Sequence, residues 1–184
     1  MENNYLGNPN LKRANVSVQW TEEQVKEYAQ CMKDPMYFIQ NYVKIISLDE
    51  GLIPFKLYDF QKEMIGWRHH FHEFPELAYK EINTAKKVVE LLKKFGVDKI
   101  ETGIGGTGVV ATLKNGNGKS VGLRADMDAL PIKEENNKHY CSKNKGVMHA
   151  CGHDGHTTML LGAVKYLSET KKFNGEVVFI FQPA

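Results

Sequence analysis

The sequence predicts an α/β fold, an incomplete mixed sheet with packed helices, preceded by a small, mainly helical N-terminal segment. Two observations support this prediction. From about residue 80 onward, helix-type and strand-type patterns alternate, as in folds with helices on a sheet. The run GEVVFIFQ at 175–182 is continuously apolar, which is typical of a strand covered on both faces. Before residue 66, the regular patterns are mostly helical.

Composition limits the class of protein. The chain has 184 residues, enough for one ordinary domain or two very small ones, and its hydrophobic content of 42% is that of a globular protein. A net charge of +2 gives no strong nucleic-acid signature and argues against an anionic membrane as partner. The polar N-terminus MENNYLGNPN lacks the features of a signal peptide, and no run is long enough to span a membrane. We therefore expect a cytoplasmic protein, and the three cysteines predict no disulfide framework.

The N-terminal segment contains two predicted helices. Residues 1–20 look irregular, and Thr21 with Gln24 then forms a capping-box pattern that starts the first helix. Pro35 is expected in the first turn of the second helix. The alternation around 52–57 predicts a short extended piece. The apolar face of the second helix would consist of Phe38, Tyr42 and Ile45.

Three further helices are predicted downstream. Apolar residues with helical spacing indicate a helix over 59–72. Asn83 is the expected cap of the next helix, which Gly96 ends. Another helix is expected at about 155–170.

Two strands are expected at 108–114 and 120–126, and the NGNG turn at 115–118 would join them as a hairpin. GIGGTG at 103–108 matches a dinucleotide-binding fingerprint, but a strand follows it instead of a helix. We interpret it as a glycine-rich entry to a strand. LKNGNGKS at 113–120 likewise precedes a strand and lacks the first glycine of a P-loop, so a turn is favoured.

The stretch MHACGHDGHTT at 148–158 is the candidate functional segment. Cys151 and His153 alternate, so an extended or turn conformation would direct both side chains to one point. Thiolate and imidazole suit zinc, and with carboxylates they suit a pair of divalent metals. A nucleophilic Cys151 and a plain polar loop remain alternatives; the nucleophile would need a partnered base and an oxyanion hole. We interpret His149 and His156 as loop residues or helix caps.

Two carboxylates follow the predicted strand at 120–126. In α/β folds, ligands gather beyond the carboxyl ends of strands. Asp126 is therefore a candidate metal ligand, and Asp128 is a candidate to orient a metal-ligating histidine.

Five motifs in order carry a resemblance to a known family. The motifs are WRHHFHEFPEL at 67–77, TGIGGTGVVATL at 102–113, GLRADMDALPI at 122–132, MHACGHDGHTTMLLGA at 148–163 and FQPA at 181–184. Together they resemble the N-terminal part of the aminoacylase-like metallo-amidohydrolases, which include hippurate hydrolases, N-acyl-amino-acid amidohydrolases and auxin-conjugate hydrolases. The resemblance covers about residues 64–184 and implies a zinc-peptidase-like fold.

The resemblance also implies a chemistry. The family hydrolyses the amide bond of small N-acyl amino acids with two divalent metal ions, zinc or manganese. Cys151 and His153 stand at two ligand positions. In the family, the general-base glutamate and a further ligand follow FQPA, whereas this chain stops at Ala184. We therefore expect a truncated enzyme with little or no amidase activity, and no family dimer because the lid domain is missing.

The N-terminal third resembles another family. GNPNLKRANVSVQWTEEQ at 7–24 and LYDFQKEMI at 57–65 are similar to the start of the large terminase subunit of T-even-like phages, a DNA-packaging ATPase. That resemblance implies adenine contacts by Phe60 and Gln61. No P-loop follows, so plain helix positions are favoured for both residues.

The two resemblances predict two domains, at 1–65 and 66–184, with a junction near Glu63–Trp67. This junction suggests a chimeric or truncated reading frame. Three hypotheses remain open: an incomplete metallo-amidohydrolase, a terminase fragment, and a non-functional fusion whose strand at 175–182 is an exposed apolar edge.

Overall fold

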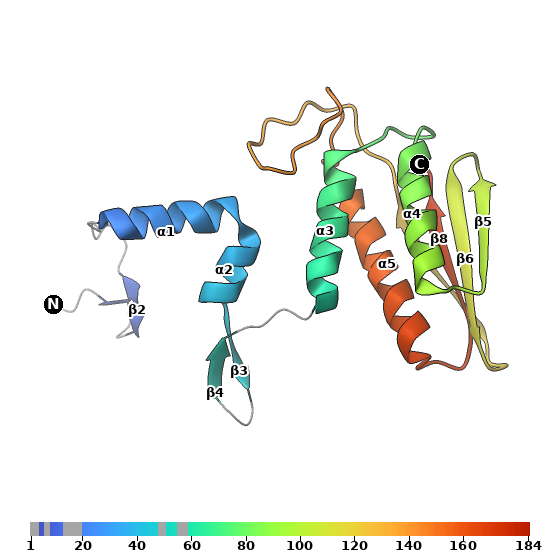
Figure 1. The fold of residues 1–184 in the computed structure, drawn as a ribbon, viewed down its shortest axis with the longest axis horizontal. Coiled ribbons are helices and arrows are strands. Elements are labelled where there is room, and N and C mark those ends of the chain that lie inside the picture. The colour runs from blue at the N-terminus through green and yellow to red at the C-terminus, as the bar shows by residue number, and fades with distance from the viewer. Residues whose placement is uncertain (1–3, 6–7, 13–19, 48–50, 55–58) are drawn as a thin grey trace. The chain divides into compact units, whose positions relative to one another are not determined.

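The computed structural model describes residues 4–5, 8–12, 20–47, 51–54 and 59–184. The chain divides into two compact units, Met1–Lys56 and Leu57–Ala184 (Figure 1). Each unit is described by itself.

The first unit begins with a short antiparallel pair, β1 (Asn4–Tyr5) and β2 (Asn8–Lys12), where the sequence predicted an irregular start. Helix α1 (Glu22–Lys33) starts at the predicted capping box. The Gln24 amide donates to Thr21 Oγ1 at 3.2 Å, and the Thr21 amide donates to Gln24 Oε1 at 3.0 Å. Two amides at the helix start are thereby satisfied.

Helix α2 (Pro35–Tyr42) begins at the predicted proline. Strands β3 (Lys44–Ser47) and β4 (Gly51–Pro54) then form an antiparallel pair. The predicted position of Ile45 on the second helix is wrong, because Ile45 pairs with Ile53 in this ladder. β-Branched side chains favour a strand over a helix end. The extended piece predicted at 52–57 is confirmed for 52–54, and 55–58 lie outside the described residues.

The second unit is a four-stranded mixed sheet with helices on one face (Figure 1), which confirms the predicted fold class. The strand order is β5-β6-β8-β7; β8 runs antiparallel to β6 and parallel to β7. The elements in chain order are α3 (Asp59–Glu73), α4 (Ile82–Phe95), β5 (Lys99–Ile104), β6 (Gly108–Asn115), β7 (Ser120–Asp126), α5 (His153–Thr170) and β8 (Gly175–Gln182).

The predicted hairpin between β6 and β7 is wrong. β8 inserts between these two strands, so the 115–118 turn leads to a strand that does not pair with β6. A Cβ on Gly118 would overlap the Asn174 carbonyl oxygen, so this glycine serves the close approach of the segment entering β8. A local turn motif could not indicate this pairing, because the intervening strand lies about sixty residues away in sequence.

β8 is a central strand, which overturns its prediction as an exposed apolar edge. Its residues alternate between buried and half-buried, so one face carries the core and the other is only partly covered; the expected cover on both faces is wrong. Strand β5 was not predicted; it forms one edge of the sheet and leads through the glycines of the GIGGTG turn into β6. The interpretation of that motif as an entry to a strand is confirmed.

The core lies between the sheet and its helices. β6 and β8 contribute every second residue, as expected for strands with one covered face. The buried apolar residues are Phe71, Val88, Leu91, Leu92, Val109, Ala111, Leu113, Ala125, Met127, Leu160, Leu161, Val164, Val177, Phe179 and Phe181.

The start of α4 differs from its prediction. Asn83 is not the cap but lies within the helix, which begins at Ile82. The Glu76 carboxylate accepts the Asn83 amide at 3.2 Å and the Thr84 amide at 2.8 Å. A carboxylate at a helix N-terminus satisfies free amides and favours the helix dipole. At the other end, Gly96 ends the helix as predicted, with φ of 71°.

The predicted junction near Glu63–Trp67 lies within α3, whereas the boundary between the two compact units falls between Lys56 and Leu57 in the chain. The helix continues without interruption through the junction. None of the helices in the described parts of the chain is both long and apolar enough to cross a membrane.

Candidate metal centre

The candidate site lies at the carboxyl ends of the parallel strands β7 and β8. These strands end together, at Asp126 and Gln182, and the Met127 amide donates to the Gln182 carbonyl at 3.0 Å. The chain then forms a long loop before it enters α5 at His153. Strand ends of this kind are where α/β folds hold their ligands.

His153 and Asp128 lie side by side, and Asp128 is the residue that was expected to orient a metal-ligating histidine. The Nδ1 atom of His153 lies 2.8 Å from Asp128 Oδ1 and 3.1 Å from the Asp128 carbonyl oxygen. A proton on Nδ1 satisfies both contacts, which leaves the Nε2 lone pair for a metal. Both side chains are mostly buried, at 17% and 13% exposure, so the imidazole is held in place.

Asp126 has a cation as neighbour. Its Oδ1 accepts from Arg124 Nε at 2.9 Å and from Arg124 Nη2 at 2.7 Å. The two residues are separated by one position on β7, so their side chains share one face of the sheet. The second carboxylate oxygen is left for another partner, which is compatible with the role predicted for Asp126.

Cys151 is exposed and lies in the turn just before α5. Gly152 separates it from His153 and adopts φ of 86°, a left-handed conformation that favours glycine. The donor types, a thiol and an imidazole fixed by a carboxylate, fit a divalent metal such as zinc. Within the described ranges, however, no group of three His, Cys, Asp or Glu side chains is arranged so that it could hold an ion.

The environment of His149 differs most from what the sequence indicated. This histidine was interpreted as a loop residue or cap, but its side chain is buried, and neither ring nitrogen has a hydrogen-bond partner. Burial lowers the pKa of His149 from 6.5 to about 4, despite the nearby Asp154. The imidazole is therefore neutral at pH 7. Only its place two residues before Cys151 hinted at a role.

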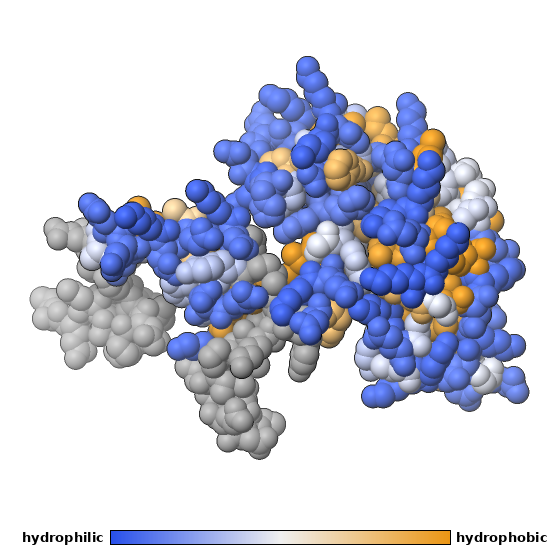
Figure 2. Space-filling model, viewed as in Figure 1, coloured by the Kyte–Doolittle hydropathy of each residue, from blue (hydrophilic) through white to orange (hydrophobic). Residues whose placement is uncertain are grey.

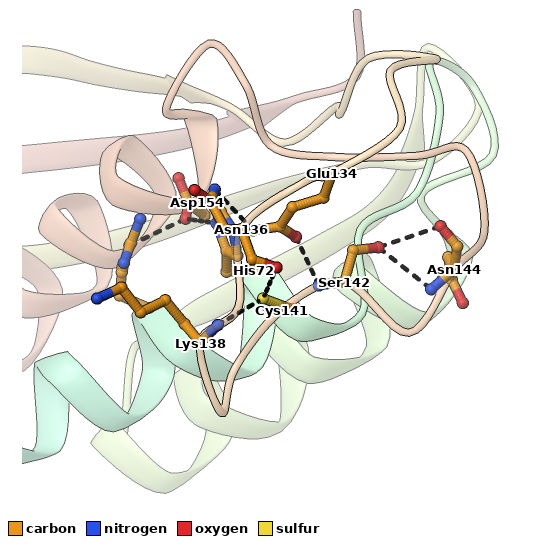
Figure 3. A network of polar contacts seen from close by, with 9 residues as sticks. His72, Glu134, Asn136, Lys138, Cys141, Ser142, Asn144 and Asp154 are labelled. Atoms are coloured by element: carbon orange, nitrogen blue, oxygen red, sulfur yellow. Dashed lines mark hydrogen bonds and ion pairs between the residues drawn. The ribbon is translucent and has the colours of Figure 1, made fainter. Parts of the chain in front are cut away.

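A buried polar network lies beside this segment and was not predicted (Figure 3). His72, near the end of α3, contacts Asp154 Oδ2 through Nδ1 at 2.7 Å and Glu134 Oε1 through Nε2 at 3.0 Å. Arg68 Nε lies 3.0 Å from the same Asp154 oxygen. Nothing in the pattern around His72 distinguished it from other polar residues on that helix.

The network shifts the pKa values of its members. The hydrogen bond to Asp154 raises the pKa of His72 against the opposing effect of burial. Burial alone would raise the pKa of Asp154, but the His72 hydrogen bond and the Arg68 charge outweigh it and lower that pKa. The pKa of Glu134 is lowered in the same way, because hydrogen bonds from Ser142 and His72 outweigh burial.

Phe60 and Gln61 lie in the first turn of α3. Phe60 is 47% exposed and lines a small pocket between α3 and α5, together with Met64 and Tyr166. Both residues occupy helix positions, and their predicted contact with adenine stays a prediction.

The second unit is similar in sequence to known hydrolases. Residues 122–184 match the sequence model of peptidase family M20/M25/M40. The hippurate hydrolase of Campylobacter jejuni is 55% identical over 135 residues, which cover 73% of this chain and 34% of that protein. The N-acyl-L-amino acid amidohydrolase of Geobacillus stearothermophilus is 45% identical over 127 residues, with 68% and 34% covered.

A solved structure agrees with these matches. The Bacillus subtilis YXEP protein, a dinuclear metal-binding peptidase from the M20 family, superposes with a TM-score of 0.65 at 40% identity, over 68% of this chain and 35% of that protein. The chain spans about a third of the length of the curated relatives that it matches. The second unit thus has the fold of M20 peptidases, and its residues 122–184 match the sequence model of the M20/M25/M40 family.

Proposed function

We propose that the chain is part of a metal-dependent hydrolase that cleaves the amide bond of small N-acyl amino acids. The observation that carries this proposal is the 2.8 Å contact between His153 Nδ1 and Asp128 Oδ1. A carboxylate that fixes an imidazole in this way is a common partner of a metal-ligating histidine. The similarity to a hippurate hydrolase and an N-acyl amino acid amidohydrolase supports the substrate class.

In this proposal each residue of the site has a definite task. Cys151 and His153 hold a divalent metal, zinc or manganese, and Asp126 supplies a carboxylate oxygen next to Arg124. Asp128 holds His153 so that Nε2 faces away from the carboxylate. When bound, the metal supplies polarisation of the amide carbonyl and a lowered pKa for water. His149 adds a neutral, buried wall beside these groups.

Metal binding is tested first, with the two cysteines of this unit as a matched pair. The full chain is loaded with Co²⁺ after dialysis against a chelator, and its thiolate-to-cobalt charge-transfer band is recorded. We expect the band in the unaltered protein and in Cys141→Ser, and its loss in Cys151→Ser. A band that survives in Cys151→Ser rules out Cys151 as a ligand.

Hydrolysis is tested separately. Metal-loaded protein is incubated with N-benzoylglycine and with N-acetylated amino acids, and release of the free amino acid is measured. The low activity expected from the sequence stays a prediction, and so does the absence of a dimer. Turnover at an ordinary enzymatic rate, lost in His153→Ala, supports the hydrolase function and contradicts the expected inactivity.

The phage terminase alternative rests on the resemblance of residues 1–65. It predicts that millimolar ATP quenches tryptophan fluorescence in the full chain and that Gln61→Ala abolishes this response. An unchanged spectrum upon addition of ATP and Mg²⁺ would count against this alternative and would leave the hydrolase proposal intact.

A further inference from the structure

Three segments that are far apart in sequence meet at the His72 imidazole. His72 comes from α3, Glu134 from the long loop after β7, and Asp154 from the first turn of α5 (Figure 3). The three side chains are at most 5% exposed. Each ring nitrogen faces a carboxylate, so the imidazole bridges two buried acidic side chains.

The Asp154 side of this bridge fixes the start of α5. Asp154 Oδ1 accepts the Gly155 amide at 2.9 Å, and the Thr158 hydroxyl donates to the Asp154 carbonyl at 2.7 Å. Asp154 follows His153 directly in the chain. The Asp154 carboxylate is thereby hydrogen-bonded to the same helix turn that carries the proposed ligand His153.

The Glu134 side fixes the loop. Glu134 Oε2 accepts the Ser142 amide at 2.6 Å, and Oε1 also accepts from Asn136 Nδ2 at 3.1 Å. The loop segment 134–144 is thus folded around one carboxylate. Its far end is attached to α3 by the Lys143 amide, which donates to the Glu73 carbonyl at 2.8 Å.

We propose that His72 is a positioning residue that couples the loop segment 134–144 to the first turn of α5 and so holds His153 and Cys151 in place for metal binding. The proposal rests on the proposed function. Its physical basis is charge: without the imidazole, no donor joins the Glu134 and Asp154 carboxylates, and Asp154 keeps only Arg68 and the Gly155 amide. Repulsion between the two carboxylates then favours separation of the loop from the helix start.

The two ring nitrogens can be replaced one at a time. In His72→Asn, the side-chain amide nitrogen stands near the Nδ1 position and can donate to Asp154, but it is too short for Glu134. In His72→Gln, the amide nitrogen stands near the Nε2 position and can donate to Glu134 but not to Asp154. His72→Ala removes both donors.

Two measurements on the full chain report separately on the Asp154 contact and on the Glu134 contact of His72. The dissociation constant for Co²⁺, with its thiolate charge-transfer band, reports the ligand segment. The hydrogen exchange rate of the Ser142 amide, measured by NMR, reports the loop. For His72→Ala we expect metal affinity to fall about 10–100-fold, as for other groups that orient ligands, and the Ser142 amide to exchange faster.

The conservative variants should separate these effects. We expect His72→Asn to keep the metal affinity and lose the Ser142 protection, and His72→Gln to do the reverse. Lys143→Ala is the matched control, because it removes an exposed ion pair to Glu73 in the same loop without touching His72; both readouts should stay unchanged.

Several results would overturn the proposal. One is an unchanged cobalt affinity in His72→Ala; another is identical behaviour of the Asn and Gln variants in both readouts, which would indicate a residue that only fills space. If His72→Ala does not fold, the proposal is tested by comparing His72→Asn with His72→Gln in both measurements. The absence of any cobalt band in the unaltered protein would instead contradict the proposed function, and the Ser142 readout would still test the coupling across the loop.

Discussion

The two units use similar local sequence signals but differ in what they bury. Helix α1 has a complete capping box, yet none of its residues is buried, and its apolar residues Val25, Tyr28 and Met32 are each more than half exposed. Helix α4 lacks a side-chain cap of its own, yet Val88 and Leu92 are fully buried against the sheet. In Figure 2, the surface of the second unit is mainly hydrophilic with apolar patches between.

This difference shows that an amphipathic pattern identifies a helix but does not supply the surface that covers it. The second unit has a sheet whose one face is lined by alternating apolar residues, so α4 and α5 have a surface to pack on, and α3 packs against α5. The first unit spans only 56 residues, a size at which a single core is marginal. The candidate metal centre accordingly lies on the unit with the core.

The largest expected effect concerns this core. Phe179 in β8 is fully buried, and Phe179→Ala should lower the free energy of unfolding of the second unit by about 3–5 kcal/mol. Tyr28→Ala, at a side chain that is 57% exposed in α1, should change it by less than about 0.5 kcal/mol. Chemical denaturation followed by circular dichroism measures both. Equal losses in the two variants would show that the contrast between the units is wrong.

The next effect concerns the buried His149. Its pKa of about 4 in the folded state lies below the ordinary value of 6.5, so the unfolded chain takes up a proton first as the pH falls. The free energy of unfolding is therefore unaffected by His149 above pH 6.5. It falls by about 3 kcal/mol in total as the pH is lowered from 6.5 toward 4.

This pH dependence is measured by denaturation of metal-free protein between pH 4 and 8. His149→Phe, which keeps a ring but does not titrate, should show a smaller loss at low pH than the unaltered chain. His156→Phe is the control at an exposed histidine and should retain the full loss. A slope that is the same in His149→Phe and in the unaltered protein would show that His149 is not the group responsible.

The helix caps give the smallest expected effects. Glu76→Ala removes the acceptor for two amides of α4 and should cost about 1–2 kcal/mol of the stability of the second unit. Thr21→Ala removes the capping box of α1 and should lower helix content, at a cost of about 1 kcal/mol or less, without changing the unfolding of the second unit. Reduced stability of the second unit in Thr21→Ala would mean that the units are coupled.

Local signals were sufficient for much of the fold. The capping box at Thr21, the proline start of α2 and the left-handed Gly96 each act within a few residues, and the structure confirms all three. The strand order could not be predicted, because β8 reaches its place between β6 and β7 from about sixty residues away. The cap of α4 was missed for a similar reason, since Glu76 lies outside the helix that it caps.

The candidate site shows the same division. The strand end marked Asp128 as a carboxylate that could orient a metal-ligating histidine, and the structure places it in contact with His153, a partner that the sequence did not specify. His72 could not be recognised, because its partners Glu134 and Asp154 are 62 and 82 residues away. The burial of His149 could not be predicted either, because it depends on how the loop packs near α3 and α5.

The most direct test of the metal centre is X-ray absorption at the zinc edge of the zinc-loaded full chain. We predict one sulfur neighbour at about 2.3 Å together with nitrogen or oxygen neighbours at about 2.0–2.1 Å. In Cys151→Ser the sulfur neighbour should disappear, and in Cys141→Ser and Cys31→Ser it should remain. A spectrum without sulfur in the unaltered protein, or a sulfur neighbour that persists in Cys151→Ser, would contradict a metal site built on Cys151.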